Sequence, residues 1–451
     1  MAGMLAARVL SEHFDEVILL ERDQYPENAT PREGVPQARH LHALLARGHQ
    51  IVEDLFPGIS EDWCQAGGEF LDVGKDFAWR TPKGWGVRFL SGIRMLAGSR
   101  PLIDLVIRRR LEDVRNVAVV ESAMVDTLTA SDSRDRVTGV TVRTPGGEVQ
   151  QLEADLVVEA SGRMSRAPEW LSALGYQPPR EGVVNAHLGY ATRLYRRTPN
   201  QGDWRALFVQ AAPPGQTRAG IAFPIEGGRW IVTVCGGGGD HAPLEERAYL
   251  DFVRSLPDPQ LYDLVRTCEP LGPIIGYRRM ENRWRHYEGM RRRPENFVVL
   301  GDAVCAFNPV YGQGMTTAAL AALVLQDCLR DPVRAGMATR FQCRLARVIR
   351  IPWMLAAGED VRYRGAEGAK PGLVDRFMQW YVDQVMAVST CDPRARLALL
   401  RVFTMTHGPQ ILFHPRVLGA AIAWLVSGGK KAANGSLTAA EIRKRHSVAP
   451  L

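Results

Sequence analysis

Residues 297–315, FVVLGDAVCAFNPVYGQGM, carry the strongest signal for the fold class. The opening apolar run of this stretch predicts a buried strand, and the glycines at its end open an apolar helix predicted for residues 314–329. Between them lie the acidic Asp302 and a turn that contains proline. The free N–H groups of a helix start can bind an anion or a carbonyl group, and glycine lets the backbone approach such a ligand closely. The alternative is an ordinary strand-to-helix turn in which Asp302 caps the helix.

A second acidic residue follows a predicted buried strand near the N-terminus. Residues 2–10 are rich in helix formers, and residues 17–20 form an apolar run that ends at Glu21. In a nucleotide-binding β-α-β unit, an acid at this position accepts hydrogen bonds from a ribose. The alternative is a surface glutamate paired with Arg22.

The glycine-rich turn that should precede this helix is incomplete. In such units a G-x-G-x-x-G turn follows a first strand, but only Gly3 is present and no strand comes before it. We expect that the start was assigned at an internal methionine and that the native chain begins upstream of Met1. The competing hypothesis is a truncated, non-catalytic scaffold with a flavin-type fold.

The rest of the chain alternates between strand-rich and helix-rich regions. Apolar spacing, glycine and proline positions define the predicted elements. These elements are a helix at 40–55, a helix at 99–113 with proline at a favoured first position, a β-meander at 117–152, a strand at 156–158, a second sheet at 183–239 and helices after 331.

Composition excludes several classes of protein. The chain has 451 residues, of which 46% are hydrophobic and 23% charged, as expected for a globular protein of two or three domains. The net charge of +7 is spread along the chain, which argues against a nucleic-acid partner. The longest apolar run, 417–426, is much shorter than the roughly 20 residues of a membrane span, and no secretory signal is visible, so we expect a cytoplasmic protein. Seven cysteines without a C-x-x-C pair predict reduced thiols and no metal site.

In order along the chain, these motifs resemble those of a known family. They are Gly3 with the helix to Glu21, the segment 32–40, Ser99-Arg100, Asp155 through Ser161-Gly162-Arg163, and the stretch from Gly301-Asp302 to Gly314. Together they resemble the single-component FAD-dependent monooxygenases of the para-hydroxybenzoate hydroxylase type, and among these most closely the bacterial polyether epoxidases. The resemblance covers about residues 1–330 and weakens over the C-terminal helices. Where much of the family has Asp-Gly, this chain has Ser161-Gly162, which leaves any role in nicotinamide recruitment open.

The resemblance implies an FAD site made from several separate segments. Glu21 would hold the adenosine ribose, Asp302 the ribityl and pyrophosphate region, and the backbone around Gly312 the isoalloxazine ring. The full set of implied cofactor residues is Gly3, Glu21, Arg22, Arg32, Gly34, Val35, Gln37, Arg100, Gly162, Asp302, Pro309, Gly312, Gln313, Gly314 and Met315.

The expected fold class is α/β, with a Rossmann-like FAD-binding domain that lacks its first strand, an inserted β-sheet substrate domain and a C-terminal helical region. The FAD-binding domain would be discontinuous. The expected boundaries are 1–79, 99–175 and 276–330 for the FAD-binding domain, 80–98 and 176–275 for the substrate domain, and 331–451 for the helical region.

The implied reaction transfers one oxygen atom from O2, through a C4a-hydroperoxyflavin, to an apolar and electron-rich alkene or arene, as in polyketide or terpenoid metabolism. FAD carries the difficult chemistry, so we expect no catalytic acid or base. His40 and His42 lie beside the expected flavin loop, and a structural role is the preferred interpretation for both. The substrate pocket should be apolar, and its candidate aromatic residues, whose alternative is simple core packing, are Trp79, Trp85, Tyr190, Phe208, Phe223 and Trp230.

Two other flavin enzymes on the same fold are alternatives. A halogenase would carry a Trp-x-Trp-x-Ile-Pro segment, which the sequence lacks, whereas a prenyl-chain reductase is excluded less firmly. No second dinucleotide-binding unit is visible. The reductant is therefore either NAD(P)H that docks transiently or reduced flavin supplied by a separate flavin reductase.

Overall fold

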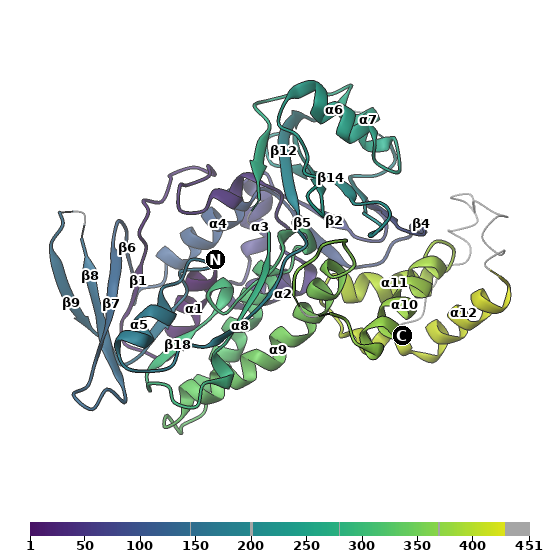
Figure 1. The fold of residues 1–451 in the computed structure, drawn as a ribbon. Coiled ribbons are helices and arrows are strands. Elements are labelled where there is room, and N and C mark those ends of the chain that lie inside the picture. Colours follow the sequence, from purple (N-terminus) through teal and green to yellow (C-terminus); the bar gives the residue numbers. More distant parts are fainter. Residues whose placement is uncertain (145, 199–201, 279, 369, 429–451) are drawn as a thin grey trace.

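The computed structural model describes residues 1–428 except 145, 199–201, 279 and 369 (Figure 1). Helices and strands alternate in the first part of the chain, and helices alone occupy its last part. The α-helices are α1 (Ala2–Leu10), α2 (Ala46–Leu55), α3 (Ile59–Gln65), α4 (Arg100–Glu112), α5 (Ala167–Ala173), α6 (Glu246–Arg254), α7 (Gln260–Val265), α8 (Gly314–Leu329), α9 (Met337–Asp360), α10 (Leu373–Val388), α11 (Pro393–Phe403) and α12 (Pro415–Val426). Short 3-10 helices are η1 (Pro36–Arg39), η2 (Tyr287–Gly289), η3 (Gly301–Ala303), η4 (Pro309–Tyr311) and η5 (Pro409–Phe413).

The strands form several sheets of different size. They are β1 (Val17–Leu20), β2 (Glu69–Asp72), β3 (Phe77–Thr81), β4 (Gly84–Trp85), β5 (Arg94–Ala97), β6 (Val117–Val120), β7 (Met124–Ala130), β8 (Val137–Arg143), β9 (Val149–Glu153), β10 (Val157–Glu159), β11 (Arg180–Val184), β12 (Gly189–Arg196), β13 (Ala206–Val209), β14 (Arg218–Ile225), β15 (Arg229–Gly236), β16 (Ile275–Tyr277), β17 (Asn282–His286), β18 (Phe297–Val299) and β19 (Cys305–Ala306).

Two parallel strand pairs and the helices against them form the first core. β1 pairs with β6, and β10 pairs with β18. Strand β18 is wholly buried, as its apolar run predicts, and α8 begins at Gly314 and ends at Leu329, the predicted bounds. Helix α1 packs on α8, and both contribute side chains to the largest apolar cluster. The predicted α/β class with inserted sheets and a C-terminal helical region is confirmed.

The second unit is a seven-stranded sheet with the order β16-β12-β15-β14-β13-β3-β4. Figure 1 shows α6 and α7 covering one side of it. The alternation of side chains in its strands separates two clusters, one under α6 and α7 and one on the opposite face. Because β3 pairs with β13 from Phe77 onward, this sheet begins three residues before the boundary expected at residue 80.

Two predicted elements differ from the structure. Val117–Val120 does not belong to the antiparallel sheet β7-β8-β9, because it forms the parallel partner of β1. The helix expected from residue 40 begins only at Ala46. Leu41, Ala43 and Leu45 lie at every second position of the preceding segment, and all three face the same pocket, so an extended backbone buries them better than a helix would.

Helices α10, α11 and α12 share an apolar cluster of their own beside the seven-stranded sheet (Figure 1), whereas α9 packs against α8 in the first core. Residues 429–451 of the expected helical region lie outside the described residues. Within the described ranges, none of the helices combines the length and the apolar character that a membrane crossing requires.

Candidate functional site

An apolar pocket lies between the seven-stranded sheet and the loop that leads into α8; we call it the sheet pocket. Its volume is about 580 Å³ when the open mouth is counted. The loop contributes Pro309–Gly312, and α11 contributes Phe403. The remaining lining residues are Leu41, Ala43, Leu45, Phe77, Tyr190, Phe208, Ala219, Gly220, Ile221, Thr233 and Cys235.

Strand register decides which of the six candidate aromatic residues face this pocket. Tyr190 is opposite Cys235, and Phe208 is opposite Ile221, so these side chains share the pocket face of the sheet. Phe223 follows Ile221 by two residues on β14 and lies deeper on the same face.

Trp79 forms the second layer of the pocket wall, with its ring 6.1 Å from that of Phe208. Trp85 and Trp230 lie on the opposite face, in the cluster under α6 and α7. The sheet pocket therefore receives Tyr190 and Phe208 directly, Trp79 and Phe223 behind them, and neither Trp85 nor Trp230.

The few polar groups of the pocket are joined to a buried histidine. The Thr233 hydroxyl lies 2.7 Å from that of Thr192, which in turn lies 2.8 Å from Nδ1 of His40. His40 is only 3% exposed. Burial, with a smaller contribution from the positive charge of Arg39, lowers the pKa of His40 from 6.5 to about 4. His40 is thus a neutral hydrogen-bonding residue at neutral pH, as its structural interpretation requires.

The low pKa of His40 predicts an acid-dependent loss of stability. His40 binds a proton near pH 6.5 in the unfolded chain and only near pH 4 in the folded chain. The contribution of neutral His40 to the free energy of unfolding is therefore complete above pH 6.5, and it disappears as the pH falls toward 4. Denaturant unfolding at pH 7 and pH 4.5 measures the effect. On acidification, the free energy of unfolding of the wild type should fall by up to about 3 kcal/mol more than that of His40→Asn. Equal losses in the two proteins would show that His40 titrates normally.

The loop before α8 has the backbone that its glycines predict. Gly312 adopts a left-handed conformation with φ 65°, and Gln313 precedes the first residue of α8, Gly314. A Cβ built on Gly314 would stand 3.7 Å from Oδ1 of Asp302, so the acid lies beside the start of the helix. The side-chain oxygen of Gln313 is buried and receives no hydrogen bond from any described residue. The segment between β18 and the first turn of α8 thus contains Asp302, Pro309, Gly312, Gln313 and Gly314.

Asp302 is a half-buried carboxyl group near two arginines. Burial raises its pKa above the usual 3.8, and the positive charges of Arg163 and Arg100 partly offset this increase. Arg163 is held by the carbonyl oxygens of Glu281 and Phe307. Arg100, the first residue of α4, is held by Asp104 through a 2.8 Å hydrogen bond from its Nε.

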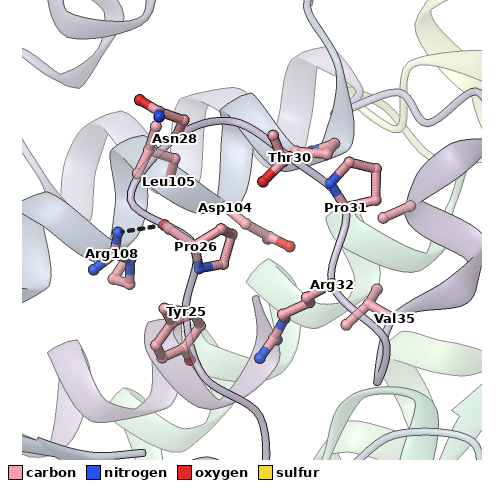
Figure 2. Close-up of a pocket in the computed structure, with 12 residues that line it drawn as sticks. Tyr25, Pro26, Asn28, Thr30, Pro31, Arg32, Val35, Asp104, Leu105 and Arg108 are labelled. Carbon is pink, nitrogen blue, oxygen red and sulfur yellow. Dashed lines mark hydrogen bonds between the residues drawn. The ribbon is translucent and has the colours of Figure 1, made fainter.

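A second hollow lies where the loop from Tyr25 to Val35 arches over α4, as Figure 2 shows. Arg32 forms a 2.6 Å ion pair with Glu21, and its guanidinium lies 4.7 Å from the ring centre of Tyr25. Asp104 and Arg108 of α4 form the opposite wall. The predicted ribose acid is thus tied to a predicted loop arginine instead of to its neighbour Arg22.

The structure places the remaining predicted cofactor residues on several elements. Arg22 donates to the carbonyl of Gly34, whose N–H donates to Asp23. Val35 lines the loop hollow, and Gln37 lies in η1 beside it. A Cβ built on Gly3 would lie 3.3 Å from the side chain of Leu19. Gly162 follows β10 and has φ 87°. Met315 is buried in the first turn of α8.

Sequence reasoning missed one set of residues near the pocket. Tyr311 and Asn308 of the loop hydrogen-bond to Asp360, at the end of α9, and Asn282 of β17 completes the set. Nothing in the local pattern around Asp360 indicates this role, because an acid at the end of a helix is usually exposed. Among the described residues, no cluster of His, Cys, Asp and Glu side chains forms a metal site.

Comparison with known proteins identifies the family. No family model matches the chain. Protein Rv3254 of Mycobacterium tuberculosis is 31% identical over 445 residues, which cover 94% of this chain and 91% of that protein. The chain belongs to the family of Protein Rv3254. The chain described here is also 27% identical over 346 residues to the kynurenine 3-monooxygenase of Salinispora tropica. The match covers 73% of this chain and 70% of that protein.

Solved structures share the fold of this member of the Rv3254 family. The flavin-dependent brominase Bmp2 superposes with a TM-score of 0.65 at 15% identity, covering 95% of this chain and 97% of that one. The p-nitrophenol 4-monooxygenase PnpA of Pseudomonas putida gives a TM-score of 0.62 at 18% identity, covering 90% and 94%. The fold is that of flavin-dependent monooxygenases and halogenases, and two relatives at 27% and 28% identity are named kynurenine 3-monooxygenase.

Proposed function

We propose that this chain uses FAD to transfer one oxygen atom of O2 to an apolar, electron-rich substrate held in the sheet pocket. The observation that carries the proposal is the position of that pocket. One of its walls is Pro309–Gly312, the loop that leads into the N-terminus of α8, where the flavin ring is expected. Polyketide or terpenoid alkenes and arenes have the apolar surface that such a lining would bind.

The residues present fit FAD on several points. Gly312 and Gly314 leave the loop backbone bare of side chains, and the buried oxygen of Gln313 needs a donor such as the N–H of an isoalloxazine ring. The N-terminus of α8 would favour negative charge on that ring. Glu21 and Asp302 would hold the ribose and ribityl hydroxyls. When bound, FAD would supply the chemistry that activates O2.

The protein's own contribution is to bind, orient and exclude water. Phe208, Ile221 and Phe403 would hold the substrate against the loop, and the apolar lining would protect a reactive group from hydrolysis. Thr233 is placed to orient a polar substituent, because its hydroxyl is held by Thr192. No described acid or base is required for the oxygen transfer itself, and the reductant is proposed to be NAD(P)H or externally reduced flavin.

Isotope labelling tests this function. The purified chain, loaded with FAD and supplied with a reductant, should convert a polyene or electron-rich arene under labelled O2 to a product that contains one heavy oxygen. An epoxide would support the polyether-epoxidase resemblance, and an alcohol or phenol would support hydroxylation. A saturated product without oxygen would indicate a reductase, and a halogenated product in the presence of halide would indicate a halogenase. A chain that cannot be loaded with FAD would contradict the proposal.

A further inference from the structure

We infer that Asp360 is a positioning residue whose buried carboxylate holds the loop Asn308–Gly312 in the place where it closes the sheet pocket. The inference rests on the proposed function, because this loop is also the expected flavin contact. Asp360 belongs to the last turn of α9, outside every segment that the family resemblance covers.

The carboxylate of Asp360 is surrounded by neutral donors. Its side chain is completely buried, at 0% exposure. The Tyr311 hydroxyl donates to Oδ1 at 2.6 Å, and Nδ2 of Asn282 donates to Oδ2 at 2.6 Å. Nδ2 of Asn308 lies 3.1 and 3.0 Å from the two oxygens. The nearby Arg362 forms its ion pairs with Glu359 and Asp383 instead.

These hydrogen bonds determine the shape of the loop. Asn308 accepts a bond from the N–H of Val310 through its side-chain oxygen and gives its own backbone N–H to Asn282 at 2.7 Å. The amide group of Asn308 is therefore fixed at one end by the turn and at the other by Asp360. Because Tyr311 is held by the same carboxylate, both ends of the 3-10 turn η4 depend on one acidic side chain.

The chemistry of the site explains why a carboxylate is needed. An uncompensated buried carboxylate is costly, and an apolar residue would leave three buried donors without an acceptor. An asparagine has a single acceptor oxygen, and its N–H2 group would face the donors of Asn308, Asn282 or Tyr311. Only a carboxylate offers acceptor positions to all of them at once.

The same burial places the titration of Asp360 within an accessible pH range. Burial raises its pKa from 3.8 to about 6, while the bonds from Tyr311, Asn308 and Asn282 oppose this increase. Acidification below about 6 therefore removes an acceptor from the loop. The other titratable or charged groups that face this site are Glu359, Arg362 and Tyr363 around the end of α9, Tyr311 of the loop, and Tyr190 and Cys235 of the sheet.

The test compares Asp360→Asn with a matched control in the FAD-loaded full chain. Asp383→Asn removes a carboxylate from α10 that bonds to Arg362 and not to the loop. The readouts are the visible spectrum of the bound flavin between pH 5 and 8, kcat and KM. A double variant, Asp360→Asn with Asn308→Asp, exchanges the carboxylate and the amide across the 3.0 Å bond and should restore the complementary pairing.

We expect a pH-dependent change in the wild-type flavin spectrum near pH 6 that is lost in Asp360→Asn and kept in Asp383→Asn. The kcat of Asp360→Asn should fall about tenfold or more, since small displacements of positioning groups are costly, and the exchanged double variant should recover part of it. A loaded Asp360→Asn protein with the wild-type spectrum, pH dependence and kcat would overturn this inference alone. A wild type that cannot take up FAD would overturn the proposed function and this inference together.

Discussion

Gly312→Val should abolish most of the activity, about 100-fold, while the protein stays folded. Gly312 has φ 65°, a conformation that costs a side-chain-bearing residue about 1–2 kcal/mol. The valine would also place its methyl groups at the wall of the sheet pocket, where Gly312 is a lining residue and its Cβ would come within 3.6 Å of Ala43. Flavin absorbance after reconstitution and the rate of product formation measure the effect.

A second glycine supplies the matched control for Gly312→Val. Gly228 lies in the turn between β14 and β15 with φ 63°, and nothing comes within 4 Å of a Cβ built on it. Gly228→Val therefore carries the same backbone penalty without touching the pocket. It should lower the unfolding free energy by a similar amount and keep its flavin and its activity. If both variants lose activity to the same extent, backbone strain and not the location of Gly312 is responsible.

Trp230→Ala should cause the largest loss of stability, about 3–5 kcal/mol, without changing the KM for the substrate. Trp230 is 2% exposed and packs under α6 and α7, on the face of the sheet that does not form the pocket. Its removal leaves a cavity in that cluster and leaves Tyr190 and Phe208 unchanged. Denaturant unfolding and steady-state kinetics separate the two effects.

Phe208→Ala is the corresponding change on the other face. Phe208 is half-buried and lines the sheet pocket, with its ring 6.4 Å from that of Phe77. We expect a smaller loss of stability than for Trp230→Ala and a marked rise in KM, because the apolar contact with the substrate is lost. An unchanged KM in Phe208→Ala, or a raised KM in Trp230→Ala, would mean that the substrate binds elsewhere.

Much of the fold could be predicted from the sequence, because the signals were local. The helix at Gly314–Leu329 and the strand at Phe297–Val299 each have an apolar pattern with a glycine near one end. Both lie where this pattern predicts them. The segment at 40–45 was predicted wrongly as helix. Its apolar residues fit a helical spacing as well as an alternating one, and only the pocket that they line decides between the two.

The candidate site was predicted in part. The stretch from Asp302 to Gly314 combines an acid, a proline and glycines, which predicts an anion or carbonyl site, and the family resemblance implies the flavin contact there. The sequence could not show which of the six aromatic residues face the pocket. Alternation in a strand places residues on two faces of a sheet, but it does not show which face forms a pocket. Trp230 and Ile231 are neighbours in sequence, yet one packs under α6 and the other on the pocket side.

The α/β class, the order of the motifs and the resemblance to FAD-dependent monooxygenases follow from the amino-acid sequence, because they depend on local patterns and short motifs. The tertiary structure alone decided which face of the seven-stranded sheet forms the pocket, that Glu21 pairs with Arg32, and that Asp360 reaches the loop at Asn308. Asp360 is separated from Asn308 by 52 residues and from Asn282 by 78. A carboxylate that meets its donors over such separations leaves no periodic signal, since the contact depends on how α9 packs and not on the residues beside it.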